Sequence, residues 1–162
     1  MITLVQRVTA AAVRVDGEVV GRIEHGLLLF VGVEATDTQA DADATARKVE
    51  NLRVFPGRTP TDLDVRAAGG SCLVVSQFTL AAELRHGNRP DFTAAAPPAL
   101  AEALYLRVAD RLRASGLPLA TGRFGAAMRV EATNDGPFSL VLTVRGGKVV
   151  SRLRADGHGA EG

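Results

Sequence analysis

The chain is predicted to fold as a single α/β domain, because strand-like and helix-like patterns follow one another along its 162 residues. Residues 2–33 and 128–144 are rich in β-branched side chains in strand-like runs, whereas 38–53 and 97–116 repeat apolar residues at helical spacing. Hydrophobic residues make up 46% and charged residues 23% of the chain, which is typical of globular proteins that bury one substantial core.

The first strands are predicted at 2–8 and 11–23, where β-branched residues alternate with polar ones. Asp16-Gly17 favours a type I′ hairpin turn, because both central positions of that turn need a positive φ. The run 26–33, "GLLLFVGV", is apolar throughout, which is typical of a strand covered on both faces. It is far too short to span a membrane.

The middle of the chain is predicted to form a helix, a loop and a buried strand. Thr38 and Asp41 form a possible N-cap pair at the start of a helix over 38–53. Residues 56–71 contain two prolines and three glycines and predict a loop. The run 72–80, "CLVVSQFTL", then predicts a buried strand.

The remaining elements are predicted to be a basic loop at 85–92, a helix at 97–116 and two final strands. Proline near the start of this helix and Gly116 at its end match the preferences of helix termini. The two strands, 128–133 and 138–144, flank the segment "NDGP", whose residues favour a turn.

Residues 145–162 are predicted to be a flexible basic tail, which leaves 1–144 as the folded domain. The tail carries four basic residues against two acidic ones, a net charge of +2, and few large apolar side chains. The whole chain has a net charge of only +1, so a nucleic-acid partner would have to bind a local basic patch.

Conventional catalytic motifs are absent from the sequence. The three histidines, His25, His86 and His158, have no other ligand residue at metal-binding spacing, so we expect no metal site. The single cysteine, Cys72, cannot form a disulfide within the chain. No nucleophile elbow, phosphate loop or signal-peptide pattern is present, so we expect a cytoplasmic protein whose chemistry would use backbone groups, hydroxyls or the substrate itself.

Amide and hydroxyl side chains gather at the end of the predicted strand 72–80, in "SQFT". In a strand, Gln77 and Thr79 would share one face, where they could line a polar pocket. The same pattern also fits a strand that simply leaves the core, and the residues alone leave both interpretations open.

Seven short segments share the order and spacing of one known family. They are "VQRV" (5–8), "NLRVF" (51–55), "VVSQFTL" (74–80), "RHGNRPDF" (85–92), "AAPPALAEALY" (95–105), "TGRFGAAM" (121–128) and "NDGP" (134–137). In this arrangement the chain resembles the D-aminoacyl-tRNA deacylase family, from Met1 to about Val144.

The resemblance implies a compact, barrel-like α/β domain that works as a homodimer in the cytoplasm. The implied activity is hydrolysis of the ester that joins a D-amino acid, or achiral glycine, to the 3′ end of tRNA. The implied partners are a charged tRNA and a second copy of the chain, with no membrane or DNA partner. No metal or organic cofactor is implied.

The family's Gly-cisPro motif falls on Gly136-Pro137. The resemblance implies that this motif of one subunit reaches into a pocket of the other, where its backbone holds the substrate's α-ammonium and excludes an L side chain. Arg7 would brace the motif through its guanidinium donors, with a surface position as the alternative. Ser139 stands where family members often have threonine.

The family's Ser-Gln-x-x-Thr motif falls on Ser76, Gln77, Phe78 and Thr79, with one residue fewer than the strict spacing. The resemblance implies a pocket here, with backbone N–H groups near Gln77 and Phe78 stabilising the oxyanion. Thr79 is the obvious candidate nucleophile, but no base is visible to activate it. Attack by water, assisted by the ribose 2′-hydroxyl, is therefore favoured, and Thr79 would shape the pocket.

Other interpretations stay open. Arg85, Arg89 and Arg123 are candidate phosphate contacts, although charged loop residues are usually only solvated. Because no catalytic triad is visible, the chain could instead be a noncatalytic dimer that binds RNA ends or small ligands. A generic esterase is the third hypothesis, and it requires an activated nucleophile.

Overall fold

The computed structural model describes residues 1–150, which form one α/β domain. Its strands are β1 (Ile2–Val15), β2 (Glu18–Ile23), β3 (Gly26–Gly32), β4 (Ser71–Ser76), β5 (Leu119–Thr121), β6 (Arg129–Arg145) and β7 (Lys148–Val150). Its helices are α1 (Gln39–Glu50), α2 (Pro98–Ala114) and the short 3-10 helix η1 (Phe78–Ala81).

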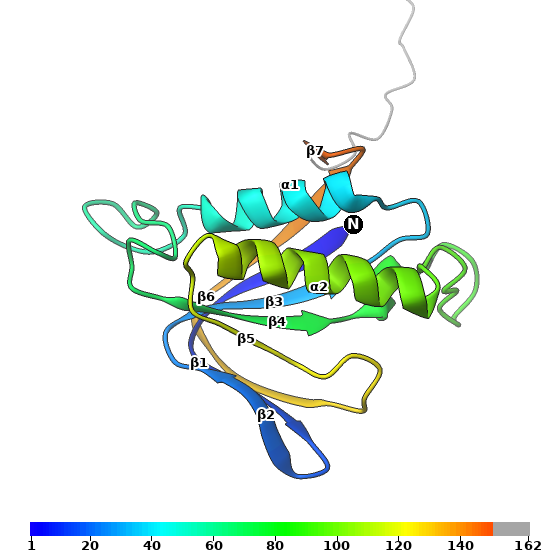
Figure 1. Ribbon diagram of the computed structural model, residues 1–162, viewed down its shortest axis with the longest axis horizontal. Helices are drawn as coiled ribbons and strands as arrows, with labels where there is room; N and C mark the ends of the chain where they lie inside the picture. Colours follow the sequence, from blue (N-terminus) through cyan, green and yellow to red (C-terminus); the bar gives the residue numbers. More distant parts are fainter. Residues whose placement is uncertain (151–162) are drawn as a thin grey trace, which may run out of the picture.

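The strands form one mixed sheet in the order β5-β4-β3-β1-β6-β7, with β2 paired to β1. Neighbours β3-β4 and β4-β5 run parallel, and the other pairs run antiparallel. The sheet curls into a half-barrel, and α1 and α2 lie side by side across one of its faces (Figure 1). The predicted single α/β domain with two main helices is therefore confirmed, and the sheet that was expected to be barrel-like is a half-barrel.

Strand β1 is continuous over 14 residues, whereas the sequence predicted a break after Val8. The predicted break falls at an irregularity in the pairing with β6. Val8 pairs with Asn134 and Ala10 pairs with Thr133, so Thr9 is an extra residue in β1. An extra residue reverses the alternation of side chains without ending the strand, which is why the apolar pattern is interrupted there.

The other predictions for the N-terminal strands are confirmed. Asp16 and Gly17 have φ values of 51° and 84°, the positive values that a type I′ turn needs. Strand β3 is covered on both faces, as its unbroken apolar run predicted. Leu27 and Leu29 pack in the core under the helices, whereas Leu28 packs in a second core on the opposite face.

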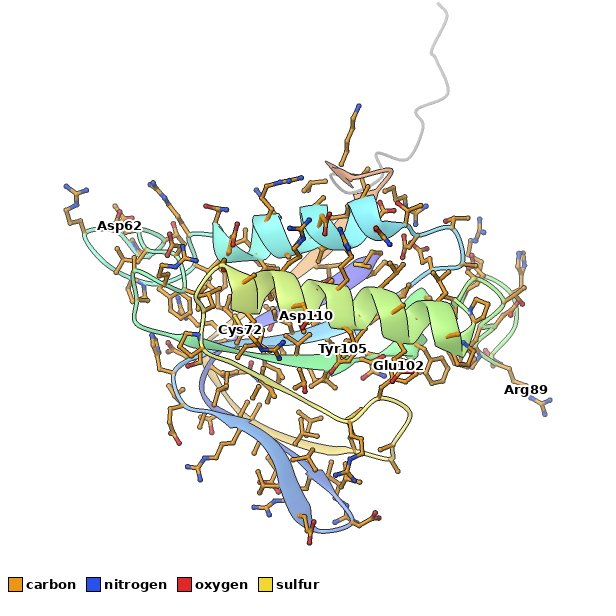
Figure 2. The ribbon with its side chains drawn as sticks, in the orientation of Figure 1. Asp62, Cys72, Arg89, Glu102, Tyr105 and Asp110 are labelled. Carbon is orange, nitrogen blue, oxygen red and sulfur yellow. The ribbon has the colours of Figure 1, made fainter. Side chains whose placement is uncertain are left out.

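Both main helices lie where the sequence predicted them. Helix α1 begins after Thr38, whose backbone N–H donates to Asp41 Oδ2 at 2.8 Å, and it ends at Glu50, earlier than predicted. Helix α2 directs Tyr105 towards the sheet (Figure 2), where the buried hydroxyl donates to the Val74 carbonyl at 3.0 Å. No helix within residues 1–150 is both long and apolar enough to cross a membrane.

The prediction of a strand over 72–80 is wrong in its second half, because β4 ends at Ser76. The neighbouring strand β3 ends at Gly32, one residue past the Val31 that pairs with Ser76, so β3 cannot pair with residues 78–80 and the chain turns into η1. Strand β5 was not predicted at all. Its three residues are too few to show a period.

The flexible tail was predicted to begin at residue 145, which is too early. Residues 145–150 complete β6 and form β7, and Gly146-Gly147 turns the chain between them with φ values of 57° and 73°. A glycine pair between two strand-like runs is a hairpin signal that was present in the sequence. The N–H of Gly147 also donates to Asp41 Oδ1 at 2.9 Å, which connects this hairpin to α1. The rest of the predicted tail, 151–162, lies outside the described residues.

An ion-pair cluster joins the two helices. Asp43 of α1 accepts hydrogen bonds from Arg107 at 2.7 and 2.8 Å and from Arg111 at 2.8 and 3.0 Å. The hydrogen bonds from Arg107 and Arg111 hold the pKa of the Asp43 carboxyl well below its ordinary value. The ionised form of Asp43 is therefore the form that stabilises the helix pair.

Replacing Asp43 by Asn is expected to lower the free energy of unfolding by about 1–2 kcal/mol at pH 7, because both arginines lose a charged acceptor. For a domain of this size the melting temperature should fall by about 3–6 °C. Since folding lowers the Asp43 pKa, its contribution is complete above the unfolded-state pKa of about 4 and is lost as the pH falls below that value. The difference between parent and variant should therefore shrink in acid.

Asp110→Asn is the matched control, because Asp110 forms only an exposed ion pair with Arg113 on α2. It should leave the melting temperature nearly unchanged. Equal effects of the two substitutions would contradict the role of Asp43.

Candidate functional site

A cavity of about 530 Å³ opens at the C-terminal end of β4. Its walls come from β4 and η1, from residues 95–101 at the start of α2, and from residues 124–130. This volume is typical of sites that bind small ligands. The lining is apolar except for Ser76 and Gln77, and none of the lining residues is titratable.

The backbone turns at Gln77, beside this cavity. The Gln77 N–H donates to the Val31 carbonyl at 2.8 Å, and its own carbonyl accepts from the Leu80 N–H at 3.2 Å. Gln77 Nε2 donates to Thr79 Oγ1 at 2.5 Å. Gln77 and Thr79 thus lie together, but through a 3-10 turn and not through the strand alternation that the sequence suggested. Thr79 is exposed and does not line the cavity.

The same turn determines which backbone donors can meet a ligand. The N–H of Gln77 is occupied by the Val31 carbonyl, so it is not available as the oxyanion donor that was expected from the sequence. The N–H groups of Phe78 and Thr79 open η1, and the first residues of a helix have no acceptor within it. The available pair of donors therefore lies one residue further along the chain.

The "NDGP" segment is not the turn between two strands that the sequence predicted. Strand β6 runs through it, and both of its halves pair with β1: Gln6 with Ser139 and Val8 with Asn134. The four residues 135–138 therefore face only Arg7, and we call them the 135–138 bulge. Gly and Pro are accepted in bulges as well as in turns, which is why the local signal was misleading.

The peptide bond between Gly136 and Pro137 is cis, as the resemblance implied. Only glycine fits at position 136, because its φ is +130° and an added Cβ would lie 3.0 Å from the Phe138 nitrogen and 3.2 Å from Arg7 Nη2. Both Gly136 and Pro137 are exposed, so the bulge presents its backbone at the surface. Beside it, Ser139 Oγ accepts a hydrogen bond from Gln6 Nε2 at 3.1 Å.

Arg7 lies against the bulge with only 12% of its side chain exposed. Its Nε donates to the Asp135 carbonyl at 3.1 Å, and its guanidinium lies 4.9 Å from the centre of the Phe138 ring. Its Nη1 donates to the Val54 carbonyl at 2.5 Å. Arg7 therefore connects the bulge to the segment that follows α1.

Within one chain the 135–138 bulge and the cavity do not form a common site. Neither the bulge nor Arg7 contributes to the cavity lining. Arg7 pairs with Leu27 at one end of β3, whereas Ser76 pairs with Val31 at the other. The separation along β3 is about 13 Å at the usual rise of a strand.

The sheet face opposite the helices carries a row of apolar side chains. Leu4 of β1 pairs with Phe30 of β3 and with Val141 of β6, so the three side chains share one face. Val141 is 69% exposed, and Leu4 and Phe30 are half-buried. We call these three residues the Leu4–Phe30–Val141 row.

The candidate phosphate contacts lie on exposed loops. Arg85 forms an ion pair with Glu83 at 2.7 Å, so its charge is already compensated. Arg89 projects from the 85–92 loop away from the body of the domain (Figure 2). Phe92, at the end of this loop, packs edge-on against Phe78 with ring centres 5.1 Å apart, which brings the loop next to η1.

Among the described residues, Cys72, His25 and His86 show no catalytic arrangement. Burial raises the pKa of the Cys72 thiol to about 12, so it has no nucleophilic character near neutral pH. The His25 ring packs on Phe55 at 5.0 Å, His86 is exposed, and His158 lies outside the described residues. Within residues 1–150, no three His, Cys, Asp or Glu side chains are grouped to hold a metal ion.

Comparison with known proteins gives a consistent result. The family model described as D-Tyr-tRNA(Tyr) deacylase matches residues 4–143. A D-aminoacyl-tRNA deacylase of Ruegeria pomeroyi is 49% identical over 145 residues, which cover 89% of this chain and 100% of that protein.

Two solved structures share the fold. The c-Myc DNA Unwinding Element Binding Protein has a TM-score of 0.84 at 37% identity, covering 90% of this chain and 99% of the other. A probable eukaryotic D-amino acid tRNA deacylase has a TM-score of 0.72 at 15% identity, covering 86% of this chain and 97% of the other.

Arg7→Met is expected to lower the free energy of unfolding by about 1–3 kcal/mol, because the partly buried carbonyls of Val54 and Asp135 lose a charged donor while the aliphatic stem is kept. Thermal unfolding measures the effect. Arg14→Met is the control, since Arg14 lies on the same strand but forms an exposed pair with Glu131. A loss for Arg7→Met no larger than for Arg14→Met would contradict the bracing of the bulge.

Proposed function

Because this chain belongs to the D-Tyr-tRNA(Tyr) deacylase family, we propose that it hydrolyses the ester between a D-amino acid and the 3′ end of tRNA. The observation that carries the proposal is the family match over residues 4–143, which includes both the Ser76–Thr79 turn and the 135–138 bulge. Esters of glycine would also be substrates, since glycine has no side chain to exclude. Because its substrate, charged tRNA, is used in the cytoplasm, the enzyme would act there.

The cavity beside η1 would hold the ester. Water attacks the carbonyl carbon, the ribose 3′ oxygen leaves, and free amino acid and tRNA result. The N–H of Phe78, which lines the cavity, would donate to the oxyanion in this apolar setting, where such bonds are strong, and the N–H of Thr79, which follows it at the start of η1, would be a second donor from the cavity rim. Ser76 and Gln77 would supply the polar contacts of the substrate.

Proton transfer would fall to the substrate's own 2′-hydroxyl. None of the cavity-lining residues is titratable, so no side chain there can act as a general base. Thr79 already accepts a hydrogen bond from Gln77 and does not line the cavity. Its role would be to hold the turn, which argues against the generic esterase.

A second copy of the chain would complete the site. The bulge and the cavity are separated within one chain, so a bulge that screens the ester would have to come from a partner. The Leu4–Phe30–Val141 row offers the surface for a two-fold dimer, because it is apolar, exposed at Val141 and close to the Gln6–Ser139 pair beside the bulge.

In this dimer, Gly136-Pro137 of one subunit would present its exposed backbone to the substrate bound by the other. Backbone carbonyls would hold the α-ammonium, and an L side chain would collide with the bulge, while a D side chain would point away. Selectivity by collision also explains why glycine passes. Arg7 would keep the bulge in place during this contact.

A noncatalytic dimer that binds RNA ends is the second candidate, favoured by the lack of titratable groups in the cavity. It predicts binding of charged tRNA without turnover. The deacylase predicts turnover, so one assay separates the two.

The purified protein is expected to release free amino acid from D-tyrosyl-tRNA without added metal, and at least about 100-fold faster than from L-tyrosyl-tRNA, which corresponds to ~2.7 kcal/mol of discrimination. Release of the labelled amino acid measures both rates, with glycyl-tRNA as a third substrate. Equal rates for the D and L esters would refute the chiral screen, and binding without release would favour the second candidate.

Val141→Glu is expected to convert a dimer into monomers and to lower the D-specific rate by about tenfold or more, because burying an unpaired carboxylate costs several kcal/mol. Sedimentation velocity and the deacylation assay measure the two effects. Val149→Glu is the matched control, as Val149 is exposed on β7, outside the row. A D-selective wild-type monomer would show that no partner is needed.

A further inference from the structure

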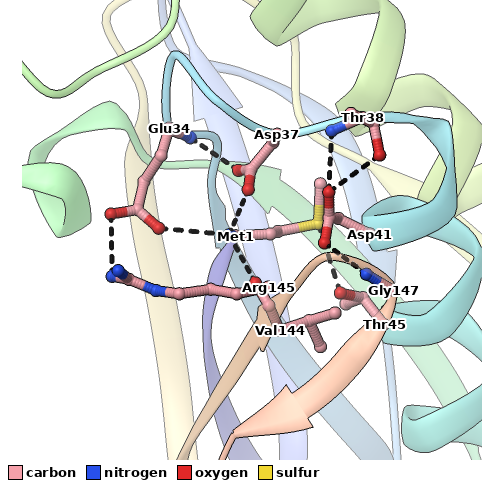
Figure 3. Close-up of polar contacts among 9 residues, drawn as sticks. All are labelled: Met1, Glu34, Asp37, Thr38, Asp41, Thr45, Val144, Arg145 and Gly147. Atoms are coloured by element: carbon pink, nitrogen blue, oxygen red, sulfur yellow. Dashed lines mark hydrogen bonds and ion pairs between the residues drawn. The ribbon is translucent and has the colours of Figure 1, made fainter.

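The α-ammonium of Met1 lies at the centre of a buried polar cluster (Figure 3). It donates to Asp37 Oδ1 at 2.5 Å, to Glu34 Oε2 at 3.2 Å and to the Val144 carbonyl at 2.9 Å. An ammonium group has three N–H bonds, and each one has an acceptor here. Met1 has no exposed surface, and its sulfur accepts a hydrogen bond from Thr45 Oγ1 at 3.2 Å.

The positive charge is needed to balance the carboxylates around it. Asp37 is only 3% exposed, and Glu34 is 15% exposed and also pairs with Arg145 at 3.1 Å. Burial raises the pKa of Asp37, and the hydrogen bond from the Met1 ammonium acts in the opposite direction. Removing that charge would leave a buried carboxylate without its partner, which is one of the more destabilising changes a protein can undergo.

The cluster is coupled to one wall of the cavity. Asp37 Oδ2 accepts from the Glu34 N–H at 2.7 Å, which closes the turn after β3. Glu34 forms a β-bridge with Ala95, and the Ala96 N–H donates to the Val33 carbonyl at 2.9 Å. Val33, Ala95 and Ala96 all line the cavity. The Met1 ammonium thus anchors the segment 33–37, and the cavity wall formed by Ala95 and Ala96 is held against this segment.

We propose that the free α-ammonium of Met1 is a positioning group, and that this nitrogen is an acylation-sensitive site of the protein. A formyl or acetyl group would turn the ammonium into an uncharged amide with a single N–H, so two of its three acceptors would lose their donor. The same loss would follow from any residue joined to this nitrogen. The turn at Glu34 to Asp37 would loosen, and with it the Ala95–Ala96 wall.

The experiment compares the chain carrying a free Met1 amine with the same chain carrying an N-formyl group, both made by cell-free translation with and without a deformylase inhibitor and verified by mass spectrometry. The formylated chain is expected to melt about 10 °C lower. Hydrogen exchange should quicken in peptides covering 33–37 and 93–97, and remain unchanged in the β1–β2 hairpin. Equal melting temperatures and equal exchange would overturn the proposal.

An Asp37→Asn background tests the assigned partner. With the carboxylate gone, formylation should lower the melting temperature by less than half as much as in the parent. The matched control, Glu131→Gln, removes an exposed carboxylate on β6 and should leave the effect of formylation complete. An equal effect of formylation in both backgrounds would contradict the pairing of the ammonium with Asp37.

A kinetic measurement separates a positioning role of the Met1 ammonium from a simple loss of folded protein. Of the three experiments, only this one rests on the proposed function. Well below both melting temperatures, formylation should raise KM for D-tyrosyl-tRNA by about threefold or more while kcat changes less, because the loosened wall binds substrate less well. A proportional fall of kcat at constant KM would overturn the positioning role. If neither form hydrolyses the ester, the proposed function fails, and melting and hydrogen exchange still decide this inference.

Discussion

Strand β1 is the constraint on which the rest of the structure depends. It pairs with β6 along most of its length, with β3 through its first half and with β2 through its second half. No strand can pair flat with two different neighbours on the same side, so the sheet has to curl where β3 gives way to β2. The curl creates two cores, one under the helices and one inside the half-barrel. The cavity opens where these two cores meet at the end of β4.

The candidate site is built from backbone geometry more than from reactive side chains. The turn at Gln77 is determined by one ladder bond to Val31 and by the end of β3 beside it. The bulge is determined by its pairing on either side of Arg7. Such a site tolerates changes in many side chains, because its working atoms belong to the main chain. It is sensitive to the few residues that hold that main chain, such as Gly136, which has no room for a Cβ.

The parts of the fold that depend on local patterns could be predicted from the sequence. The turn at Asp16-Gly17 depends on the preference of these two residues for positive φ, and the Thr38–Asp41 pair starts a helix through contacts within one turn. The errors occur where a neighbour decides the outcome. The end of β4 depends on where β3 stops, and "NDGP" became a bulge because both flanking segments pair with the same strand.

The site was predictable only in its motifs. The resemblance indicated Ser76–Thr79 and Gly136-Pro137, but the occupied N–H of Gln77 and the distance between the two motifs depend on strand register. Contacts of the Met1 nitrogen have no sequence signal at all, because their acceptors lie more than thirty residues away and one of them is a backbone carbonyl.

The 135–138 bulge also affects which face of the sheet each side chain of β6 points to. Thr9 adds one residue to β1, and the bulge adds three to β6, so each strand carries an odd insertion. An odd insertion exchanges the inward and outward faces of a strand. On β6, Val130 therefore packs inside the half-barrel, whereas Leu142 and Val144, also at even positions, pack under the helices. The exchange at Thr9 in β1 matches the exchange at the bulge in β6, so paired residues of the two strands, such as Thr3 and Leu142, stay on the same face. The two irregularities therefore compensate each other, and neither could be removed alone without separating the faces of the paired strands.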